Sequence, residues 1–474
     1  MHCTGHTATH DASRQHPGVM TKVMWSLRRS MLCDARHSTS NVWSKCQANV
    51  RFELHRSPLD HPEQSRYNKQ PLVCMRRGAS MDFPPERIVI IGGGVSAART
   101  AQAIRDLDER CTITVLSEES LPPYDRPPLS KEALLTEPAP PPTTLLSLEE
   151  AAARGIDLRL GHRVVGLEAE ARLLEVDGAD GPVPYDKLVI ATGTRARSLP
   201  ALQGVPRVHH LRTAEDAARI RSSLESNERL VLIGGGFIGL EVAAAARARG
   251  VEVTVVEVAP RPLAGVLGEE LATCLQQWHS DRGVRFHCGV SITGALDRGT
   301  HVELSLDDGT ELEAGCVVLG VGVHRDLDWI ARAGVATHVG VVCDHDGRTN
   351  VAEVFAAGDI ACAHDGDVCR PVSHWTAAIE SGQRVAHGLL GLEQEEEIDE
   401  AYFWSYQGDL RLMSVGHRTP LAEMHLVSGD LASGKFVVEW REGDKVVGAV
   451  AANSARDFLH SRMALRRSKE ALAR

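Results

Sequence analysis

The stretch Ile233-Gly234-Gly235-Gly236-Phe237-Ile238-Gly239-Leu240-Glu241 decides the fold that this sequence predicts. An apolar run, Arg229–Ile233, precedes it, and an alanine-rich helical pattern follows it. A first copy, Ile91-Gly92-Gly93-Gly94-Val95-Ser96-Ala97, follows the apolar run Arg87–Ile91 and leads into a second helical pattern. A strand, a glycine-rich turn and a helix begin a βαβ unit, so the sequence predicts this unit twice.

Each copy carries the residue types that bind a dinucleotide. The glycines permit a tight turn and let the backbone approach a pyrophosphate, while the helix N-terminus offers free N–H groups. A second strand ends in a carboxylate, Glu118 in the first unit and Glu257 in the second, which can accept hydrogen bonds from ribose hydroxyls. Ala97 replaces the third glycine of the first copy, where a methyl group is tolerated because the contact is helix–strand packing. Two complete units predict an α/β fold with two doubly wound, Rossmann-like nucleotide-binding domains.

The composition favours a large globular protein and excludes several functional classes. The 474 residues suggest roughly three domains, and a hydrophobic content of 43% is enough for sizeable cores. The formal net charge of −11 argues against nucleic-acid binding, and no apolar run reaches the ~18 residues of a membrane helix. Eleven cysteines without regular spacing do not indicate a disulfide framework. We therefore expect reduced thiols, a cytoplasmic location and no metal site.

Residues 1–82 differ from the rest of the chain. They lack sustained periodicity, and basic side chains outnumber acidic ones. A basic leader is typical of a transit peptide, but this one contains acidic residues and no clean amphipathic helix. The competing interpretations are a disordered tail and a gene model that begins too far upstream, with Met81 as a credible start.

The rest of the chain predicts further elements. The prolines of Leu121–Lys131 predict a rigid extended segment rather than a helix. A helix, an antiparallel meander with two turns, and a basic closing helix are predicted at Ser373–Leu390, at Glu423–Val450 with turns at Ser428-Gly429 and Glu442-Gly443, and at Ser454–Arg474.

Motifs along residues 86–460 resemble those of one enzyme family. They are Gly-Gly-Gly-Val-Ser-Ala (92–97), Pro-Tyr-Asp-Arg-Pro-Pro-Leu-Ser-Lys (123–131), Ala-Thr-Gly (191–193), Leu-Arg-Thr (211–213), Gly-Gly-Gly-Phe-Ile-Gly-Leu-Glu (234–241), Ala-Ala-Gly-Asp (356–359), His-Trp (374–375) and Phe-Trp-Ser-Tyr-Gln (403–407). The set is similar to the FAD-dependent, NADH-consuming ferredoxin reductases, in the pyridine nucleotide-disulfide oxidoreductase superfamily. These reductases serve Rieske ring-hydroxylating dioxygenases and bacterial cytochromes P450.

The resemblance implies that the NADH unit interrupts the FAD domain, so that Asp359 returns to complete the FAD site. The expected parts are a FAD domain over residues 83–200 and 323–396, an NAD domain over 201–322, and a small α/β C-terminal domain over 397–474. The residues expected to bind FAD are Gly92, Gly94, Ser96, Ala97, Glu118, Arg126, Lys131, Val164, Ala191, Thr192, Gly193, Arg212, Asp359 and Trp375. Those expected to bind NADH are Gly234, Gly236, Phe237, Ile238, Gly239, Glu241, Glu257 and Gly322.

Lys131 and Glu241 are the expected catalytic residues. The resemblance implies that they meet below flavin N5 as an ion pair, where a hydride arrives and the protonation state has to be controlled. Two ordinary surface charges are the alternative, which the Pro-Pro-Leu-Ser-Lys context disfavours. The helix that begins near Trp375 is expected to point its N-terminus at the flavin, where its dipole stabilises negative charge. Core packing of Trp375 is compatible with that role.

The stretch 117–137 contains no cysteine. Disulfide reductases of the superfamily place a Cys-x4-Cys pair there, and peroxidase-like relatives a single redox cysteine near Ser130. A flavin in this protein therefore has no local dithiol to reduce, and we expect an external [2Fe–2S] ferredoxin or a rubredoxin as the acceptor. The alternatives that remain open are a rubredoxin reductase, an NADH oxidase or quinone reductase, and an apoptosis-inducing-factor-like flavoprotein used for binding or redox sensing.

Glu257 predicts NADH rather than NADPH as the donor, because a 2′-phosphate would meet its carboxylate. Arg261 argues the other way, but it has no second cation beside it.

The partner side departs from the family pattern. Val323-His324-Arg325 replaces the usual Pro-Asn, and Tyr406 stands where Asp is commoner; we expect both on the nicotinamide and partner side. Phe403 and Trp404 are compatible with a partner-facing edge and with core packing. The oligomeric state is a monomer or a homodimer. The expected docking surface for an acidic ferredoxin is the basic C-terminal helix with Arg462, Arg466, Arg467 and Lys469.

Overall fold

The computed structural model describes residues 84–472, apart from 227, 366–367, 372–373 and 395–399. The predicted leader over residues 1–82 lies outside these described residues. Among the helices of the described part, none is both long and apolar enough to cross a membrane.

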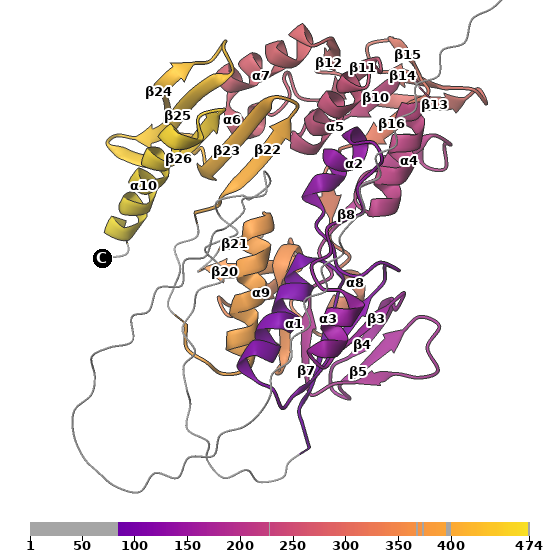
Figure 1. Ribbon diagram of the computed structural model, residues 1–474, viewed down its shortest axis with the longest axis vertical. Helices are drawn as coiled ribbons and strands as arrows, with labels where there is room; N and C mark the ends of the chain where they lie inside the picture. The colour runs from indigo at the N-terminus through magenta and orange to yellow at the C-terminus, as the bar shows by residue number, and fades with distance from the viewer. Residues whose placement is uncertain (1–83, 227, 366–367, 372–373, 395–399, 473–474) are drawn as a thin grey trace, which may run out of the picture. The chain divides into compact units, whose positions relative to one another are not determined.

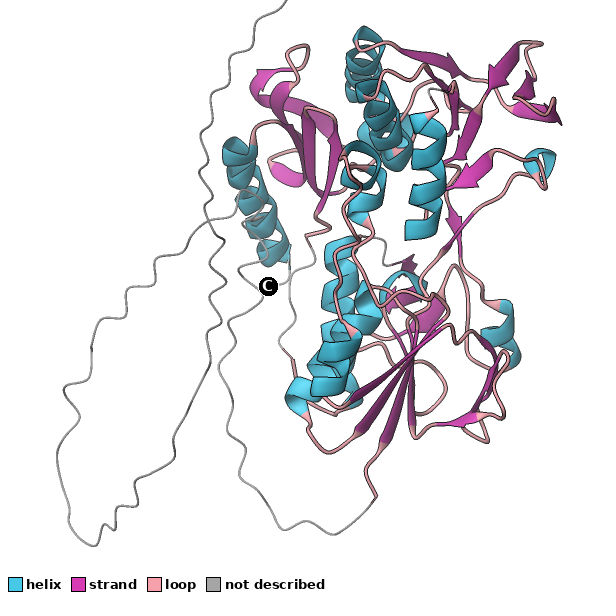
Figure 2. Cartoon of the chain, turned by 45° about the vertical axis from the view of Figure 1, so that its right-hand side comes forward, coloured by secondary structure: helices cyan, strands magenta, loops and turns pink. Residues whose placement is uncertain are grey.

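A five-stranded parallel sheet carries the first glycine-rich turn (Figures 1 and 2). β1 pairs in parallel with β2 and β7, so the turn after β1 opens at the carboxyl edge of the sheet between two neighbours. The helices α1 (Val95–Leu107) and α9 (Trp375–Leu389) pack on one face. In order across the sheet, the strands are β19 (Val354–Ala356), β7 (Lys187–Ile190), β1 (Arg87–Ile91), β2 (Thr112–Ser117) and β3 (Ile156–Leu160), with α3 (Leu148–Ala153) before β3.

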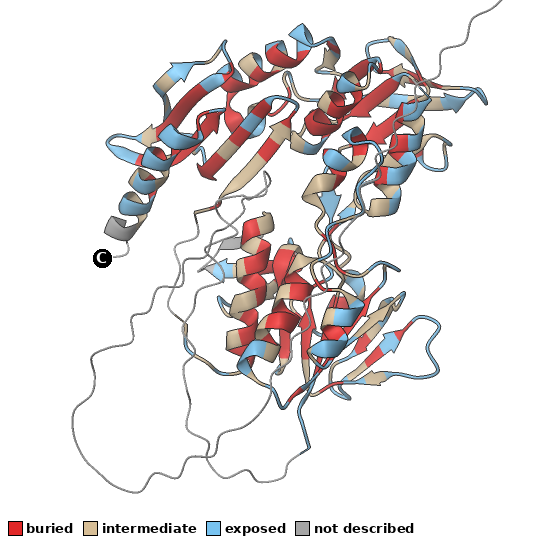
Figure 3. Ribbon diagram, viewed as in Figure 1, coloured by how far each residue is buried: buried red, intermediate tan, exposed pale blue. Residues whose placement is uncertain are grey.

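Both faces of this sheet are buried, as expected for parallel strands (Figure 3). Successive side chains of β1 point to opposite faces: Ile88 and Ile90 contact the core beneath α1 and α9, while Val89 and Ile91 contact the other core. That second core is closed by the elements β4 (Val164–Glu168), β5 (Leu173–Val176), β6 (Val183–Pro184), α8 (Asp328–Arg332) and the sheet of β18 (Val341–Cys343), β20 (Ala361–Asp365) and β21 (Val368–Pro371).

A second five-stranded parallel sheet carries the second glycine-rich turn, after β10. α4 (Ala214–Glu225) and α5 (Phe237–Ala248) cover one face, and the meander of β13 (Ile292–Asp297), β14 (Val302–Leu306) and β15 (Glu311–Ala314) covers the other. The strands in order are β12 (Val284–Cys288), β11 (Val253–Glu257), β10 (Leu230–Ile233), β16 (Cys316–Leu319) and β9 (Val208–His210), with η2 (Pro200–Leu202), α6 (Ala264–Leu267) and α7 (Glu269–Asp281) beside them.

An antiparallel sheet follows in the C-terminal part. One face shares a core with α5, α6 and α7, which includes Trp278, Leu410 and Phe436, and the other face packs against α10 (Ala455–Leu472). The strands in order are β22 (Phe403–Gln407), β23 (Leu410–Gly416), β26 (Lys445–Ala452), β25 (Lys435–Glu442) and β24 (Glu423–Asp430). The predicted α/β architecture, with two Rossmann-like parallel sheets and a C-terminal domain, is therefore confirmed.

Two short strands, β8 (Arg195–Ala196) and β17 (Val323–His324), pair antiparallel where the chain passes between the two parallel sheets. β19 is separated in sequence from the other strands of the first sheet by the whole second sheet, and it pairs with β7. This pairing returns the chain to the first sheet and places η3 (Gly358–Ile360) at its carboxyl edge.

Two local predictions were wrong. The proline-rich segment is not extended: it forms the 3₁₀-helix η1 (Pro127–Ser130) followed by α2 (Glu132–Leu135), because proline is tolerated in a first helical turn, where its missing N–H is not needed. Ser428-Gly429 lies within β24, and the chain turns at 431–434 instead. Gly429 has φ +80°, and a Cβ there would lie 2.0 Å from the carbonyl oxygen of Lys435, so this glycine permits close strand approach at a bulge.

Candidate active site

The first glycine-rich turn leaves open space at the start of α1. Gly92 has φ +134°, and a Cβ there would lie 2.2 Å from the carbonyl oxygen of Ala191, so only glycine fits. Gly94 caps α1, and no atom lies within 4 Å of where its Cβ would be. The hydroxyl of Ser96 is buried without a hydrogen-bond partner among the described residues. A free helix N-terminus and an unpartnered buried hydroxyl fit the pyrophosphate of FAD.

The second turn has the same geometry. Gly234 has φ +103°, and its Cβ would lie 2.3 Å from the carbonyl oxygen of Gly320. A Cβ on Gly239 would lie 2.4 Å from the carbonyl oxygen of Gly234, so the third glycine lets helix and turn approach closely. Gly236 caps α5 and is open to a ligand. At the equivalent place in the first copy Ala97 is fully buried, so its methyl group is accommodated.

Glu257 lies at the end of β11, with both carboxylate oxygens held by the backbone. Oε2 accepts from the N–H of Gly235 at 2.6 Å, and Oε1 from that of Ala259 at 2.8 Å. A carboxylate has about four acceptor positions, so ribose hydroxyls can still donate to it. Arg261, the cation that argued for a 2′-phosphate, lies 3.3 Å from Glu269 and hydrogen-bonds Gln276 at 3.5 Å. The geometry favours a ribose with a free 2′-hydroxyl.

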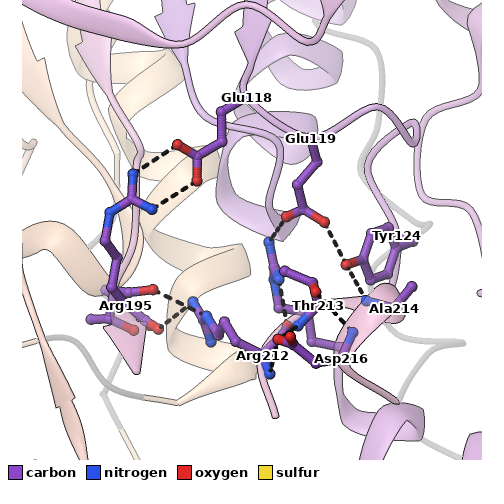
Figure 4. A network of polar contacts seen from close by, with 11 residues as sticks. Glu118, Glu119, Tyr124, Arg195, Arg212, Thr213, Ala214 and Asp216 are labelled. Atoms are coloured by element: carbon purple, nitrogen blue, oxygen red, sulfur yellow. Dashed lines mark hydrogen bonds and ion pairs between the residues drawn. The ribbon is translucent and has the colours of Figure 1, made fainter. Parts of the chain in front are cut away.

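Glu118, the corresponding carboxylate of the first unit, already has a partner. Arg195 donates from both Nη atoms to its two oxygens, at 3.0 and 2.7 Å (Figure 4), and Arg163 lies 3.8 Å away. A ribose at Glu118 would share the carboxylate with Arg195, so the ribose role of Glu118 stays a prediction.

A polar network joins the proline-rich segment to the start of α4 (Figure 4). Glu119 accepts from the hydroxyl of Tyr124 and from Arg126, both at 2.6 Å. Arg126 also donates to the carbonyl oxygen of Arg212 at 2.6 Å, and the Tyr124 oxygen accepts from the N–H of Ala214. Burial raises the pKa of Tyr124 to about 12, so the phenol stays protonated. The network holds the guanidinium group of Arg126 and the backbone of Arg212, two residues predicted to bind FAD.

Asp359 lies in η3 with positive charge around it. Burial raises the pKa of its carboxyl group, and the cations Arg212, Arg325 and Arg126 oppose that shift. Arg212 Nη2 lies 3.8 Å from Asp359 Oδ2. Arg126 also pairs with Glu119, so three guanidinium groups face two carboxylates, and the positive charge that is left over fits a diphosphate.

Arg325, which we predicted on the nicotinamide and partner side, contacts a residue that we predicted to bind FAD, so its place relative to the two nucleotides stays a prediction. Its Nε donates to the carbonyl oxygen of Asp359 at 2.5 Å. The pairing of β17 with β8 directs the chain after His324 back toward the first sheet.

Lys131 and Glu241 form a buried ion pair. Nζ lies 2.7 Å from Oε2, and the two side chains are 10% and 5% exposed. Ser130 donates to the same oxygen at 2.5 Å, Ser405 donates to Oε1 at 2.7 Å, and Lys131 also donates to the carbonyl oxygen of Pro127. Lys131 follows η1, while Glu241 belongs to α5, which begins at the second glycine-rich turn. Burial excludes the alternative of two ordinary surface charges.

Trp375 begins α9, after the capping residue His374. Its indole N–H donates to Asp125 Oδ1 at 2.7 Å. Burial raises the pKa of Asp125, and the hydrogen bond from Trp375 opposes that shift. The contact fixes the start of α9 against the segment that also carries Arg126 and Lys131.

Phe403 and Trp404 contact aromatic side chains of other elements. Phe403 stacks on His374 with ring centroids 5.2 Å apart and meets Phe237 edge to face at 4.8 Å. Trp404 meets Trp375 edge to face at 5.5 Å. These contacts join β22 to the N-terminal ends of α5 and α9, which agrees with the packing interpretation of the pair.

The remaining predicted residues lie at the ends of strands and helices. Gly193 has φ +66°, and its Cβ would lie 3.3 Å from Arg212 Nη2. Gly322 has φ +90° in open space, and Ile238 is 53% exposed in the first turn of α5. Ala191 and Thr192 follow β7, and Val164 begins β4.

The comparisons with known proteins decide the family. The model of the pyridine nucleotide-disulphide oxidoreductases matches residues 86–382, and that of the reductase C-terminal domain matches residues 402–474. The chain belongs to the pyridine nucleotide-disulphide oxidoreductase family. The ferredoxin–NAD(+) reductase component of a p-cumate 2,3-dioxygenase system from Pseudomonas putida is 36% identical over 379 residues, 79% of this chain and 92% of the relative. Rhodocoxin reductase from Rhodococcus erythropolis is 34% identical over 384 residues, 80% of this chain and 89% of the relative.

Solved structures agree with these relatives. The chain resembles one in the covalent putidaredoxin reductase–putidaredoxin complex with a TM-score of 0.75 and 29% identity, covering 80% of this chain and 93% of that one. The ferredoxin reductase for the CYP199A2 system from Rhodopseudomonas palustris gives the same TM-score and coverage, at 31% identity.

The segment 117–137, where disulfide reductases of the family carry their redox cysteines, holds no cysteine. Cys111, Cys274, Cys288, Cys316 and Cys343 are free, and burial raises the pKa of the Cys316 thiol to about 12. The expectation of reduced thiols was wrong for Cys362 in β20, which is disulfide-bonded.

The sequence did not single out several polar residues that this member of the family brings to the ion pair. Ser405 and Gln407 belong to the motif 403–407, in which the sequence assigned no role to these two residues, and no sequence pattern pointed to His279.

Two cavities of about 330 and 610 Å³ lie elsewhere, and no residue of either glycine-rich turn lines them.

Proposed function

We propose that this protein takes a hydride from NADH onto bound FAD and delivers the electrons, one at a time, to a [2Fe–2S] ferredoxin that supplies an oxygenase. The carrying observation is the buried pair of Lys131 and Glu241. It joins the segment beside the first glycine-rich turn to the helix that starts at the second. FAD, when bound, supplies the hydride acceptor and releases electrons singly.

The chain's own residues would bind, orient and tune the two nucleotides. The first turn, Ser96, Arg212 and Asp359 would hold FAD, and the second turn and Glu257 would hold NADH. Lys131 would keep a fixed positive charge near the reacting ring, because the ion pair with Glu241 holds its ammonium group in place. The hydride donor is NADH, which agrees with the relatives' names and with the carboxylate of Glu257 at the proposed ribose position.

A ferredoxin acceptor is supported by the relatives, several of which are named as ferredoxin–NAD(+) reductase components. The basic C-terminal helix remains our proposed docking surface, with one change. Arg462 forms an ion pair with Glu400 and lies over the ring of Tyr402, so we leave it out of the proposed surface. The domain boundaries given above, a cytoplasmic location and a monomer or homodimer stay predictions.

An anaerobic experiment tests this function. The purified protein should contain one FAD per chain, and its flavin absorbance should bleach on rapid mixing with NADH. A folded protein that takes up no FAD, or whose flavin stays oxidised with NADH, would contradict the proposal.

A further inference from the structure

A chain of buried hydrogen bonds runs from α7 to the ion pair. His279 Nε2 lies 2.7 Å from Gln407 Oε1, Gln407 Nε2 lies 3.1 Å from Ser405 Oγ, and Ser405 Oγ lies 2.7 Å from Glu241 Oε1. His279 is 1% exposed, and Ser405 and Gln407 are fully buried. Three elements distant in sequence therefore meet behind the carboxylate that holds Lys131.

The chemistry of the groups sets the direction of every bond. Glu241 faces Lys131, so its carboxylate is charged and only accepts; Ser405 therefore donates its single proton to it. The Ser405 oxygen then accepts from the amide nitrogen of Gln407, and the amide oxygen is left to accept from His279. Burial lowers the pKa of His279 to about 4, so the ring is neutral and carries its proton on Nε2.

The other tautomer of His279 would reverse the chain. With the proton on Nδ1, the unprotonated Nε2 would face Gln407, which would turn its amide so that the nitrogen donates to His279. The amide oxygen would then accept a hydrogen bond from the Ser405 hydroxyl. The Ser405 lone pairs would face Glu241 Oε1, and the buried carboxylate would lose a charge-assisted hydrogen bond.

We propose that His279, Gln407 and Ser405 are positioning residues for the redox step, because they point a row of donors at Glu241. The row holds the carboxylate in one orientation, and the carboxylate holds the Lys131 ammonium group. No proton moves along the row. The proposal rests on the proposed function, in which Lys131 and Glu241 lie beside the reacting ring.

The first experiment reads the tautomer directly and needs no turnover. The ¹⁵N and ¹H NMR spectrum of histidine-labelled protein, with His279→Gln used to assign the signal, should show an Nε2–H proton in both the FAD-free and the FAD-bound protein. An Nδ1–H tautomer would overturn the proposal whether or not the protein reduces ferredoxin.

The second experiment separates positioning from packing. In anaerobic rapid mixing, Ser405→Ala should lower the limiting rate of flavin reduction by NADH about tenfold, the value of about one such hydrogen bond, with the apparent Kd of NADH changed less than twofold. Ser461→Ala is the matched control, because Ser461 is also a buried serine of the C-terminal part and has no hydrogen-bond partner among the described residues. It should keep the parental rate.

Conservative replacement at the far end completes the test. His279→Leu should lower the limiting rate several-fold, and His279→Gln, whose amide nitrogen can donate to Gln407, should recover most of it. Parental rates in both Ser405→Ala and His279→Leu would mean that the row only packs the interface. If the parent flavin itself is not reduced by NADH, the proposed function fails, while the NMR result still decides the direction of the row.

Discussion

Removing one partner of the Lys131–Glu241 pair should destabilise the protein far more than removing both. At the Nζ–Oε2 distance of 2.7 Å, Coulomb attraction is about 6 kcal/mol for an effective dielectric constant near 20. Desolvation of two side chains that are at most 10% exposed offsets most of it. A single replacement, Lys131→Met or Glu241→Gln, leaves a buried group without its partner and should cost about 3–5 kcal/mol.

The assay is a double-mutant cycle on the FAD-free protein. Urea unfolding, followed by tryptophan fluorescence, gives the free energy of unfolding of the parent, both single variants and the double variant. The double variant should recover about 2 kcal/mol or more relative to the sum of the single losses. Both single variants should also slow flavin reduction by NADH at least tenfold after FAD is restored. Single losses below about 0.5 kcal/mol with no coupling, the behaviour of an exposed pair, would refute the reasoning.

Three further predictions concern cofactor choice, FAD affinity and pH. Glu257→Ser should narrow the NADH-to-NADPH ratio of kcat/KM at least about tenfold, because ~1.4 kcal/mol of carboxylate repulsion against a 2′-phosphate is lost. Arg325→Gln should raise the Kd of FAD several-fold, measured by flavin fluorescence, and leave the Kd of NADH unchanged, because Arg325 faces Asp359. Burial lowers the pKa of His279 from 6.5 to about 4, so between these two pH values His279 binds a proton in the unfolded protein but not in the folded protein. Its contribution makes the free energy of unfolding fall by up to about 3 kcal/mol as pH drops from about 6.5 to about 4.

Each of these has a distinct contrary result. A higher kcat/KM for NADPH in the parent protein would mean that Glu257 is not at the ribose. A Kd of FAD in Arg325→Gln equal to that of the parent protein would mean that Arg325 contacts the backbone of Asp359 but does not contribute to FAD binding. If His279→Gln showed the same pH dependence of the free energy of unfolding as the parent, His279 would not be the buried titrating group.

Rules that consider only neighbouring residues along the chain predicted the elements whose conformation depends on those neighbours. The two glycine-rich turns fixed both parallel sheets, since Gly92 and Gly234 meet a carbonyl oxygen of the neighbouring strand's end that no side chain could approach. The same rules failed at Pro127, because proline is excluded from helix interiors but not from first turns. They failed at Gly429, where glycine permits strand contact rather than a turn.

The candidate site likewise contains residues that the sequence could predict and residues that it could not. Asp359 and Lys131 were predictable because motif residues surround them, and the resemblance brought in Glu241 from α5. Ser405, Gln407 and His279 were not, because their contacts join α5, α7 and β22, and no spacing in the sequence encodes a contact between elements so far apart. The contact of Arg325 with Asp359 was not predictable for the same reason, since it depends on the pairing of β17 with β8.

The central claim, electron transfer from NADH to a [2Fe–2S] ferredoxin, is tested most directly by cytochrome c reduction with and without ferredoxin. With NADH and the FAD-loaded protein, cytochrome c should be reduced quickly only when a [2Fe–2S] ferredoxin is added, and each NADH should reduce two ferredoxins. Replacing the ferredoxin by a rubredoxin should give a much lower rate. Equally fast reduction without any ferredoxin, or no stimulation by any of a panel of [2Fe–2S] ferredoxins from oxygenase systems, would contradict the account.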